Sequence, residues 1–285
     1  MTHGYYAYDD NGNTLSETDG DSTKTYQYNV KSKLTDFIDG TNTTSYQYNV
    51  DGIRVNKTVN GTTKYFIVDS NRDYAQVLAE SDDSDQVLTN YLYGLDLISQ
   101  ASNNESYYYL YDGLGSTQAL TDSSETVTDT YDHEAFGELL NQSGETENSY
   151  LFTGEQYDNE LDNYYLRARY YDQGIGRFSQ MDEWGGKTCK PITLNKYIYA
   201  DSDAINGIDP SGYMTIAGQL SIVNASMRLS SVSMPSYASF ALKASAATYI
   251  VAVGFENTSW SIFEATSAPK IKSANDKVAY EGNRR

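Results

Sequence analysis

Two stretches of the sequence, TYQYNVKSKLTDF at residues 25–37 and SYQYNVDGIRVNK at residues 45–57, decide the fold. They begin with the same Tyr-x-Tyr-Asn pattern and lie 20 residues apart. One period earlier, YYAYDDNGNTLSE at residues 5–17 fits the same register. Looser copies of the pattern follow at residues 90–96, 108–122 and 129–140. Three consecutive matching registers indicate an internal repeat, in which each unit is buried by its neighbours.

The repeat unit predicts a pair of β-strands. Tyrosines two residues apart project from the same face of a strand. The Asp or Asn that follows them, with a nearby Gly, is typical of a tight turn. Twenty residues accommodate two strands of six or seven residues and their turns. We therefore predict an all-β fold of stacked hairpins in one curved or spiralling sheet, whose tyrosines pack in the core or, alternatively, form a ladder of rings that binds sugars.

Composition supports β structure and excludes several classes of function. Tyrosine supplies 28 residues, against eight Phe and two Trp, and the net charge of the 285-residue chain is −19. A strongly acidic chain repels phosphate, so we expect no nucleic-acid partner. One Cys and two His argue against a disulfide framework or a metal site, and we expect no cofactor. The sequence contains no run of 18 apolar residues, so we expect no membrane-spanning helix.

Charge divides the chain near Met214. Residues 1–214 carry 13 basic and 35 acidic side chains, whereas residues 215–285 carry seven basic and four acidic ones. Tyrosine falls from 25 residues to three across the same point, and the second part is rich in Ser and Ala. Such a change of composition indicates two separate units. We expect the second unit to be a small irregular or helical segment.

The repeats resemble those of Rhs proteins, also called YD-repeat proteins, and the resemblance sharpens from residue 107 onward. The motifs that carry it are YYLRARYYD at 164–172, GRF at 176–178, LNKYIY at 194–199 and DPSG at 209–212. They follow one another as in the Rhs repeat-associated core. The resemblance divides the chain into a YD-repeat sheet (1–106), a core (107–214) and a variable C-terminal segment (215–285).

The resemblance implies a β-shell that the core closes by spiralling inward. In this family a variable segment, often a toxin, follows an Asp-Pro-x-Gly motif, here Asp209, Pro210 and Gly212. Several members cut their own chain there by aspartyl-protease chemistry. The cleavage site implied for this chain lies between Met214 and Thr215. The alternative is that this Pro-Ser-Gly turn only ends a domain.

The resemblance also supplies candidate catalytic residues. Aspartyl proteolysis needs two carboxylates, one acting as base and the other as acid. Asp172 and Asp182 are the pair in the matching motif, and Arg169 is their candidate support. The chain departs from the family by having Gln173 and Glu183 where proline commonly follows each aspartate. The alternative is that both aspartates only shape turns.

We therefore expect the C-terminal part of a larger, secreted or cell-surface product that presents its own C-terminal segment in cis, and releases it by autoproteolysis, in bacterial competition. An immunity protein is then an expected partner. The chain starts inside a repeat and shows no signal peptide. Two alternatives stay open: an adhesive module that binds a cell-surface glycan, and an inactive structural remnant. For the segment itself, a remnant or a membrane-active segment is favoured over a catalytic toxin.

Overall fold

A computed structural model describes residues 5–213 and 215–217 of the chain. The chain divides into two compact units, residues 1–221 and residues 222–285, and all described residues belong to the first. Within the described ranges the secondary structure consists of β-strands and three short 3₁₀ turns. The predicted all-β class is therefore confirmed for these residues. The prediction of an irregular or helical segment falls almost wholly outside the described residues.

One antiparallel sheet of 14 strands accounts for the first two thirds of the described chain. Its strands are β1 (Tyr5–Tyr8), β2 (Thr14–Asp19), β3 (Ser22–Tyr28), β4 (Leu34–Asp39), β5 (Asn42–Tyr48), β6 (Arg54–Val59), β7 (Thr62–Asp69), β8 (Gln76–Ser81), β9 (Val87–Tyr93), β10 (Leu97–Ser102), β11 (Glu105–Tyr111), β12 (Thr117–Thr121), β13 (Val127–His133) and β14 (Leu139–Ser143). Each strand pairs with the next one in sequence. The 20-residue period thus corresponds to one hairpin plus its connection, as the repeat predicts.

The sheet passes without interruption through the predicted division at residues 106 and 107, which lies inside β11. The separation of a YD-repeat part from a core part at this point therefore stays a prediction from the sequence motifs.

Where an Asp or Asn follows a Tyr-x-Tyr pair, it builds the turn at that end of the sheet. The Asn29 side-chain oxygen accepts hydrogen bonds from the backbone N–H groups of Lys31 and Lys33, at 2.9 and 3.1 Å. The same pair of bonds recurs two and four residues after Asp9, Asn49 and Asp112, which also follow a Tyr-x-Tyr pair. It is also made by Asp82 and Asp122, which follow β8 and β12. These side chains mimic a backbone turn, which explains why Asp or Asn suits these positions.

The first tyrosine of each pair points into the core. The buried members of this set, with Phe66 in the place of one tyrosine, are Tyr26, Tyr46, Phe66, Tyr91, Tyr109 and Tyr131. They form two apolar clusters together with residues from the second half of the described chain. Tyr46 and Tyr170, for example, have ring centroids 5.6 Å apart. The repeat tyrosines therefore pack in the core.

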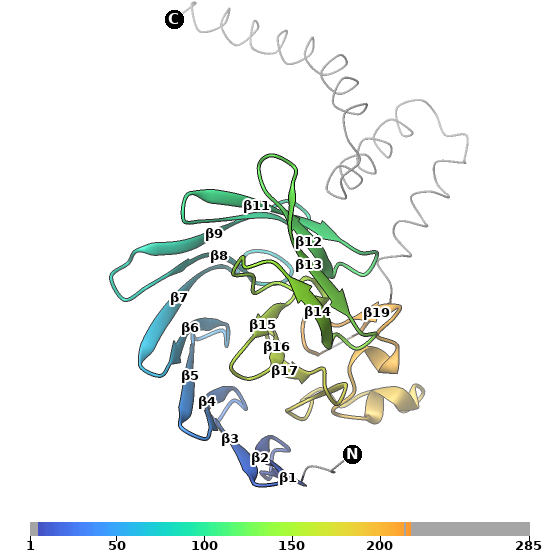
Figure 1. The fold of residues 1–285 in the computed structure, drawn as a ribbon. Helices are drawn as coiled ribbons and strands as arrows, with labels where there is room; N and C mark the ends of the chain where they lie inside the picture. Colours follow the sequence, from blue (N-terminus) through green and yellow to red (C-terminus); the bar gives the residue numbers. More distant parts are fainter. Residues whose placement is uncertain (1–4, 214, 218–285) are drawn as a thin grey trace, which may run out of the picture. The chain divides into compact units, whose positions relative to one another are not determined.

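The chain after β14 folds into the concave side of the large sheet (Figure 1). Its elements are η1 (Phe152–Gly154), β15 (Gln156–Asp158), β16 (Asn163–Leu166), β17 (Arg169–Asp172), β18 (Arg177–Phe178), η2 (Pro191–Leu194), η3 (Ala200–Ser202), β19 (Gly207–Ile208) and β20 (Ile216–Ala217). Strands β15 to β18 form a small antiparallel sheet, and β19 pairs with β20. We call residues 150–213 the plug.

A buried cation fastens the plug to the large sheet. Arg54 of β6 lies 2.8 Å from the carboxylate of Asp158 and 2.7 Å from the side-chain oxygen of Gln156. Its guanidinium also stacks on the ring of Tyr165, 4.2 Å from the centroid. Because Arg54 and Asp158 are both almost fully buried, each neutralises a charge that would otherwise be costly to desolvate.

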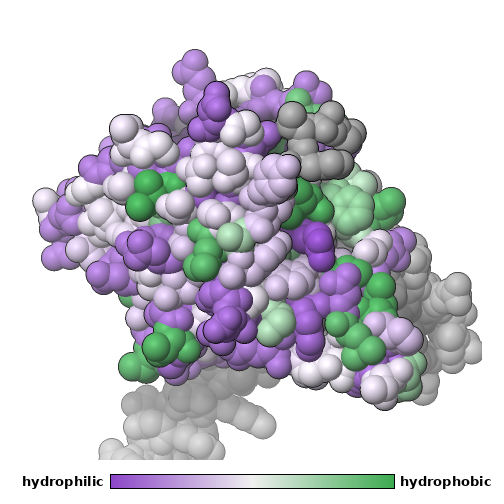
Figure 2. Space-filling model, turned by 90° about the horizontal axis from the view of Figure 1, so that it is seen from below, coloured by the Kyte–Doolittle hydropathy of each residue, from purple (hydrophilic) through white to green (hydrophobic). Residues whose placement is uncertain are grey.

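Much of the visible surface is polar. Figure 2 shows the described residues from below, with hydrophilic and near-neutral side chains over most of this face and hydrophobic ones in small separate groups. Scattered apolar residues of this kind are ordinary on a protein surface, so this face gives no indication of a docking site.

Candidate functional site

The candidate site is built around the turn between β16 and β17. Leu166 pairs with Arg169 across this hairpin, so Arg167 and Ala168 form its two-residue turn. Arg169 is nearly buried, and its guanidinium lies 3.6 Å from the centroid of the Phe178 ring. The hairpin thereby fixes the guanidinium in a low-dielectric environment, where its charge acts strongly on its neighbours.

Two buried carboxylates face this one guanidinium. A terminal nitrogen of Arg169 lies 3.2 Å from Oδ2 of Asp182 and 3.8 Å from Oδ2 of Asp209. Burial lowers the pKa of Arg169, while the two aspartates act in the opposite direction. Arg169 also donates from its other terminal nitrogen to the carbonyl of Lys196, at 3.0 Å. The arrangement therefore joins two carboxylates through a shared cation.

The remaining oxygens of both carboxylates are also engaged. Oδ1 of Asp182 accepts the backbone N–H of Trp184 at 2.8 Å. Oδ1 of Asp209 accepts the Ser211 hydroxyl at 3.0 Å and the backbone N–H of Tyr213 at 3.1 Å. These bonds hold the two carboxyl groups in fixed orientations, as an acid–base pair requires.

The segment before the predicted cleavage site lies against the same hairpin turn. Its carbonyls at Pro210, Ser211 and Gly212 accept hydrogen bonds from Arg167 Nη1, the Ala168 backbone N–H and Arg169 Nε respectively. Gly212 has a φ of +70°, and a Cβ atom there would lie 2.4 Å from the Leu166 carbonyl oxygen. Only glycine allows this close approach.

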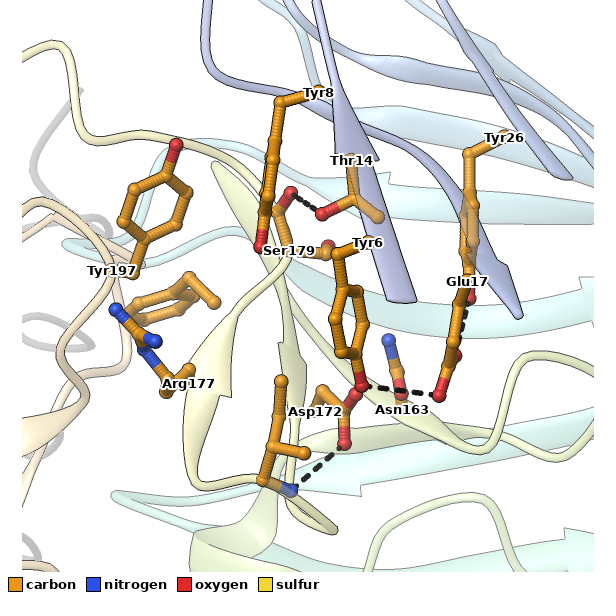
Figure 3. A pocket seen from close by; sticks show the side chains of 12 residues that line it. Tyr6, Tyr8, Thr14, Glu17, Tyr26, Asn163, Asp172, Arg177, Ser179 and Tyr197 are labelled. Carbon is orange, nitrogen blue, oxygen red and sulfur yellow. Dashed lines mark hydrogen bonds between the residues drawn. The ribbon is translucent and has the colours of Figure 1, made fainter. Parts of the chain in front are cut away.

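The structure separates Asp172 from this site. Asp172 and Arg169 are three residues apart on β17, so their side chains project from opposite faces of the strand. Asp172 lines a different pocket, of about 20 Å³, with Tyr6, Glu17 and Tyr26 of the large sheet (Figure 3). Its carboxylate accepts the backbone N–H of Ile175 at 3.3 Å, whereas Asp182 bonds Arg169. Asp172 and Asp182 therefore bond different partners, and their pairing stays a prediction from the resemblance.

The environment of Asp172 is nevertheless unusual. Burial, followed by the nearby carboxylate of Glu17, raises the pKa of Asp172 to about 6. Glu17 itself accepts hydrogen bonds from the hydroxyls of Tyr6 and Tyr26, at 3.1 and 3.3 Å. The pocket volume suits a single water molecule rather than a sugar ring.

The cleavage site itself is only partly described. Met214 lies outside the described residues, while Thr215 is described and is followed by β20. Because β20 pairs with β19, the chain on both sides of residue 214 is attached to the plug. The segment 218–285 lies outside the described residues.

The sequence analysis named Arg169 as a support for Asp182, and the two residues are in contact in the structure. It also placed Asp209 and Gly212 in the motif before the cleavage site. It did not identify Asp209 as the second carboxylate on Arg169, although Asp209-Pro210 carries the Asp-Pro pattern that the resemblance attached to catalytic aspartates. It also did not single out Arg167, which bonds the Pro210 carbonyl, or Glu155, whose carboxylate accepts a bond from Arg167 at 2.7 Å, because a single sequence gives no signal for these contacts.

Two further observations concern the described residues alone. They contain no cluster of three or more His, Cys, Asp and Glu side chains arranged to hold a metal ion. They also contain no helix of the length and hydropathy needed to cross a membrane.

A meandering sheet of tyrosine-rich hairpins curved around an aspartate-containing plug defines a YD-repeat shell. Comparison with known families agrees: the Teneurin YD-shell family matches residues 1–205. The chain belongs to this family.

The chain is similar to parts of much longer proteins. The chain is 32% identical over 215 residues to the tRNA3(Ser)-specific nuclease WapA of Bacillus spizizenii, a match that covers 73% of this chain and 9% of that protein. It is 29% identical over 181 residues to Salivary gland surface protein 1 of Aedes aegypti, covering 61% of this chain and 5% of that protein. The chain thus spans less than a tenth of the length of these relatives.

Solved structures share the fold. The Photorhabdus luminescens Tc holotoxin pore superposes with a TM-score of 0.58 at 18% identity, over 73% of this chain and 11% of that one. The TcdB2-TccC3 complex gives a TM-score of 0.56 at 18% identity, over 72% and 11% of the two chains. At this level of identity the likeness concerns the fold alone.

Proposed function

We propose that this chain is the closing part of a YD-repeat shell and that it cuts itself once, after Met214, to free the segment 215–285. The observation that carries the proposal is the shared guanidinium. Arg169 contacts the carboxylates of Asp182 and Asp209 and binds the carbonyl of Gly212, two residues before the scissile bond. Catalytic carboxylates and substrate segment therefore meet at one cation.

The proposed reaction is hydrolysis of the Met214–Thr215 peptide bond. One aspartate, ionised, takes a proton from a water molecule as its oxygen bonds to the Met214 carbonyl carbon. The other aspartate, protonated, gives its proton to the carbonyl oxygen. When the tetrahedral intermediate collapses, one of its two hydroxyl groups returns a proton to the aspartate that had donated one, the C–N bond breaks, and the proton taken from water passes to the leaving nitrogen of Thr215. The products are a carboxyl group on Met214 and an amine on Thr215.

Asp182 and Asp209 are the proposed catalytic pair in place of Asp172 and Asp182. Asp182 and Asp209 act as a pair, so we assign the acid and base roles to the pair rather than to either residue. Arg169 bonds the Asp182 carboxylate and the Gly212 carbonyl, so it holds one member of the pair beside the substrate segment.

The biological role follows from the relatives and is proposed for the whole product. The WapA relatives are named as nucleases acting on tRNA, and the match covers 73% of this chain. We propose that the remaining segment is the variable, toxin-like part, that the product is secreted, and that it acts in competition between bacteria. An immunity protein is the partner expected for such a segment.

The carbohydrate-binding alternative has less support. The repeat tyrosines that would form a ring ladder are mostly buried in the core. The pocket lined by Tyr6, Tyr8 and Tyr197 is too small for a sugar ring.

The proposal is tested by synthesising the chain in a cell-free system and following its cleavage with time. Asp182→Asn and Asp209→Asn are each expected to leave the chain whole, because each removes one member of the acid–base pair. Asp172→Asn is the matched control, since this aspartate lies in a different pocket, and it is expected to cleave like the wild type. Cleavage that persists in Asp182→Asn and Asp209→Asn, or stops only in Asp172→Asn, contradicts the proposed pair.

A further inference from the structure

We propose that Arg167 is a positioning residue for the self-cleavage and that it fixes the chain before the scissile bond in register with the two aspartates. This inference rests on the function proposed above. It concerns a residue outside the proposed catalytic pair, whose guanidinium bonds the chain before the scissile bond.

The turn residue Arg167 has an unusual backbone conformation. Its φ is +55°, in the left-handed region that favours glycine. A long side chain at such a position is unfavourable unless the surroundings hold it there, and strain of this kind concentrates at functional sites. Contacts of the Arg167 side chain must therefore offset the cost of this backbone conformation.

The Arg167 side chain makes three polar contacts that stabilise it in this conformation. Its Nη1 donates to Oε2 of Glu155 at 2.7 Å and to the carbonyl of Pro210 at 2.5 Å. Its Nε donates to the carbonyl of Ala75 at 2.9 Å, in the connection between β7 and β8. Glu155 is buried, and burial raises its pKa while Arg167 acts to lower it. The guanidinium is thus held between the large sheet and the chain that precedes the cleavage site.

Three consecutive donors of the turn bind three consecutive carbonyls of that chain. Arg167, Ala168 and Arg169 bind the carbonyls of Pro210, Ser211 and Gly212, in the same order. The segment itself is a turn, closed by the bond from the Gly212 N–H to the Asp209 carbonyl at 3.2 Å, and the three contacts hold its backbone groups in fixed register. Arg169 fixes the end nearest the scissile bond, and Arg167 fixes the other end.

A glycine at residue 167 separates positioning from folding. Arg167→Gly suits the left-handed turn, so a residue that served only the turn would be replaced without loss. The same change removes the bond to the Pro210 carbonyl. Because it also leaves the Glu155 carboxyl buried without its partner, the double variant Arg167→Gly with Glu155→Gln removes that charge and keeps the test decisive.

The experiment measures cleavage during cell-free synthesis and thermal stability in the uncleaved Asp182→Asn background. We expect Arg167→Gly and the double variant to cleave about 10- to 100-fold more slowly, the loss that a misplaced substrate causes. We expect the double variant to melt close to its Asp182→Asn parent. Arg72→Gly is the matched control, because Arg72 also bonds a carboxylate and a carbonyl, those of Asp69 and Gly94, but touches no part of the site.

A second readout does not depend on the chemistry. In the Asp182→Asn background, loss of the Arg167 contact is expected to speed the cut that added chymotrypsin makes after Tyr213. If the wild type stays whole, the proposed autoproteolysis is wrong, and this readout still decides whether Arg167 holds the segment. Wild-type rates of self-cleavage in Arg167→Gly, or an unchanged chymotrypsin cut, overturn the inference.

Discussion

Replacing Arg54 by Met tests whether the plug is held in the sheet by a buried cation. The change removes the partner that lies 2.8 Å from Asp158 and leaves that carboxylate in the core. Breaking a buried ion pair in this way costs about 3–5 kcal/mol. Lys57 stays 3.4 Å from Asp158 and is partly exposed, so we expect the lower end, about 3 kcal/mol. For a unit of this size that corresponds to a melting temperature lower by about 6–12 °C.

The assay is thermal unfolding by circular dichroism in the Asp182→Asn background, which keeps the chain whole. Arg72→Met is the control, because its pair with Asp69 is largely exposed and contributes about 0–1 kcal/mol. Adding Asp158→Asn to Arg54→Met is expected to recover part of the loss, since it removes the unpaired buried charge. If Arg54→Met unfolds at the temperature of its parent, or if its melting temperature falls no further than that of Arg72→Met, the buried pair does not anchor the plug.

Three further outcomes are expected. Because the pKa of Asp172 is raised to about 6, its ionised form is disfavoured in the folded state, so this group's stabilising contribution is present at low pH and is lost as the pH rises from about 4 through 6. Asp172→Asn should therefore raise the free energy of unfolding by about 1–3 kcal/mol at pH 7.5 and leave it unchanged near pH 4; an equal effect at both pH values would refute this. Gly212→Ala should both slow self-cleavage and lower the melting temperature in the Asp182→Asn background, because its Cβ would lie 2.4 Å from the Leu166 carbonyl oxygen. Gly20→Ala, at a φ of +60° with nothing within 4 Å, should cost only about 1 kcal/mol of backbone strain, and a cost as large as that of Gly212→Ala would contradict the close-contact argument.

The large sheet could be predicted because its units repeat. The Tyr-x-Tyr-Asn pattern fixes which side chains face inward, and the following Asn29 or Asn49 fixes the turn. Local rules of this kind depend on neighbouring residues only, so they can be read from one sequence. The strand lengths of six or seven residues in β3 to β6 follow from the same period.

The plug could be predicted only in part because its contacts join residues far apart in the chain. Arg54 meets Asp158 at a sequence separation of 104 residues, and no repeat marks this pair. The pairing of Asp172 with Asp182 was implied by the resemblance to the Rhs core motif. Side chains three residues apart on a strand project from opposite faces, so Asp172 points away from Arg169. This rule could have been applied to residues 169–172 from the sequence alone, once they were assigned to a strand.

Asp209 illustrates a third situation, in which the residue was identified but its partner was not. Its place before the cleavage site came from the Asp-Pro-x-Gly motif, whereas its position 3.8 Å from Arg169 depends on how the chain returns to the hairpin turn. That return is set by Gly212 and by the three carbonyl contacts, which involve backbone atoms that no sequence pattern displays.

The most direct test of self-cleavage is the intact mass of the purified wild-type chain, with the first residues of any small fragment sequenced. The account predicts that the 31.8 kDa chain is replaced by two products, the smaller of which begins at Thr215. A single species with the full mass, or a cut at another position, would contradict it.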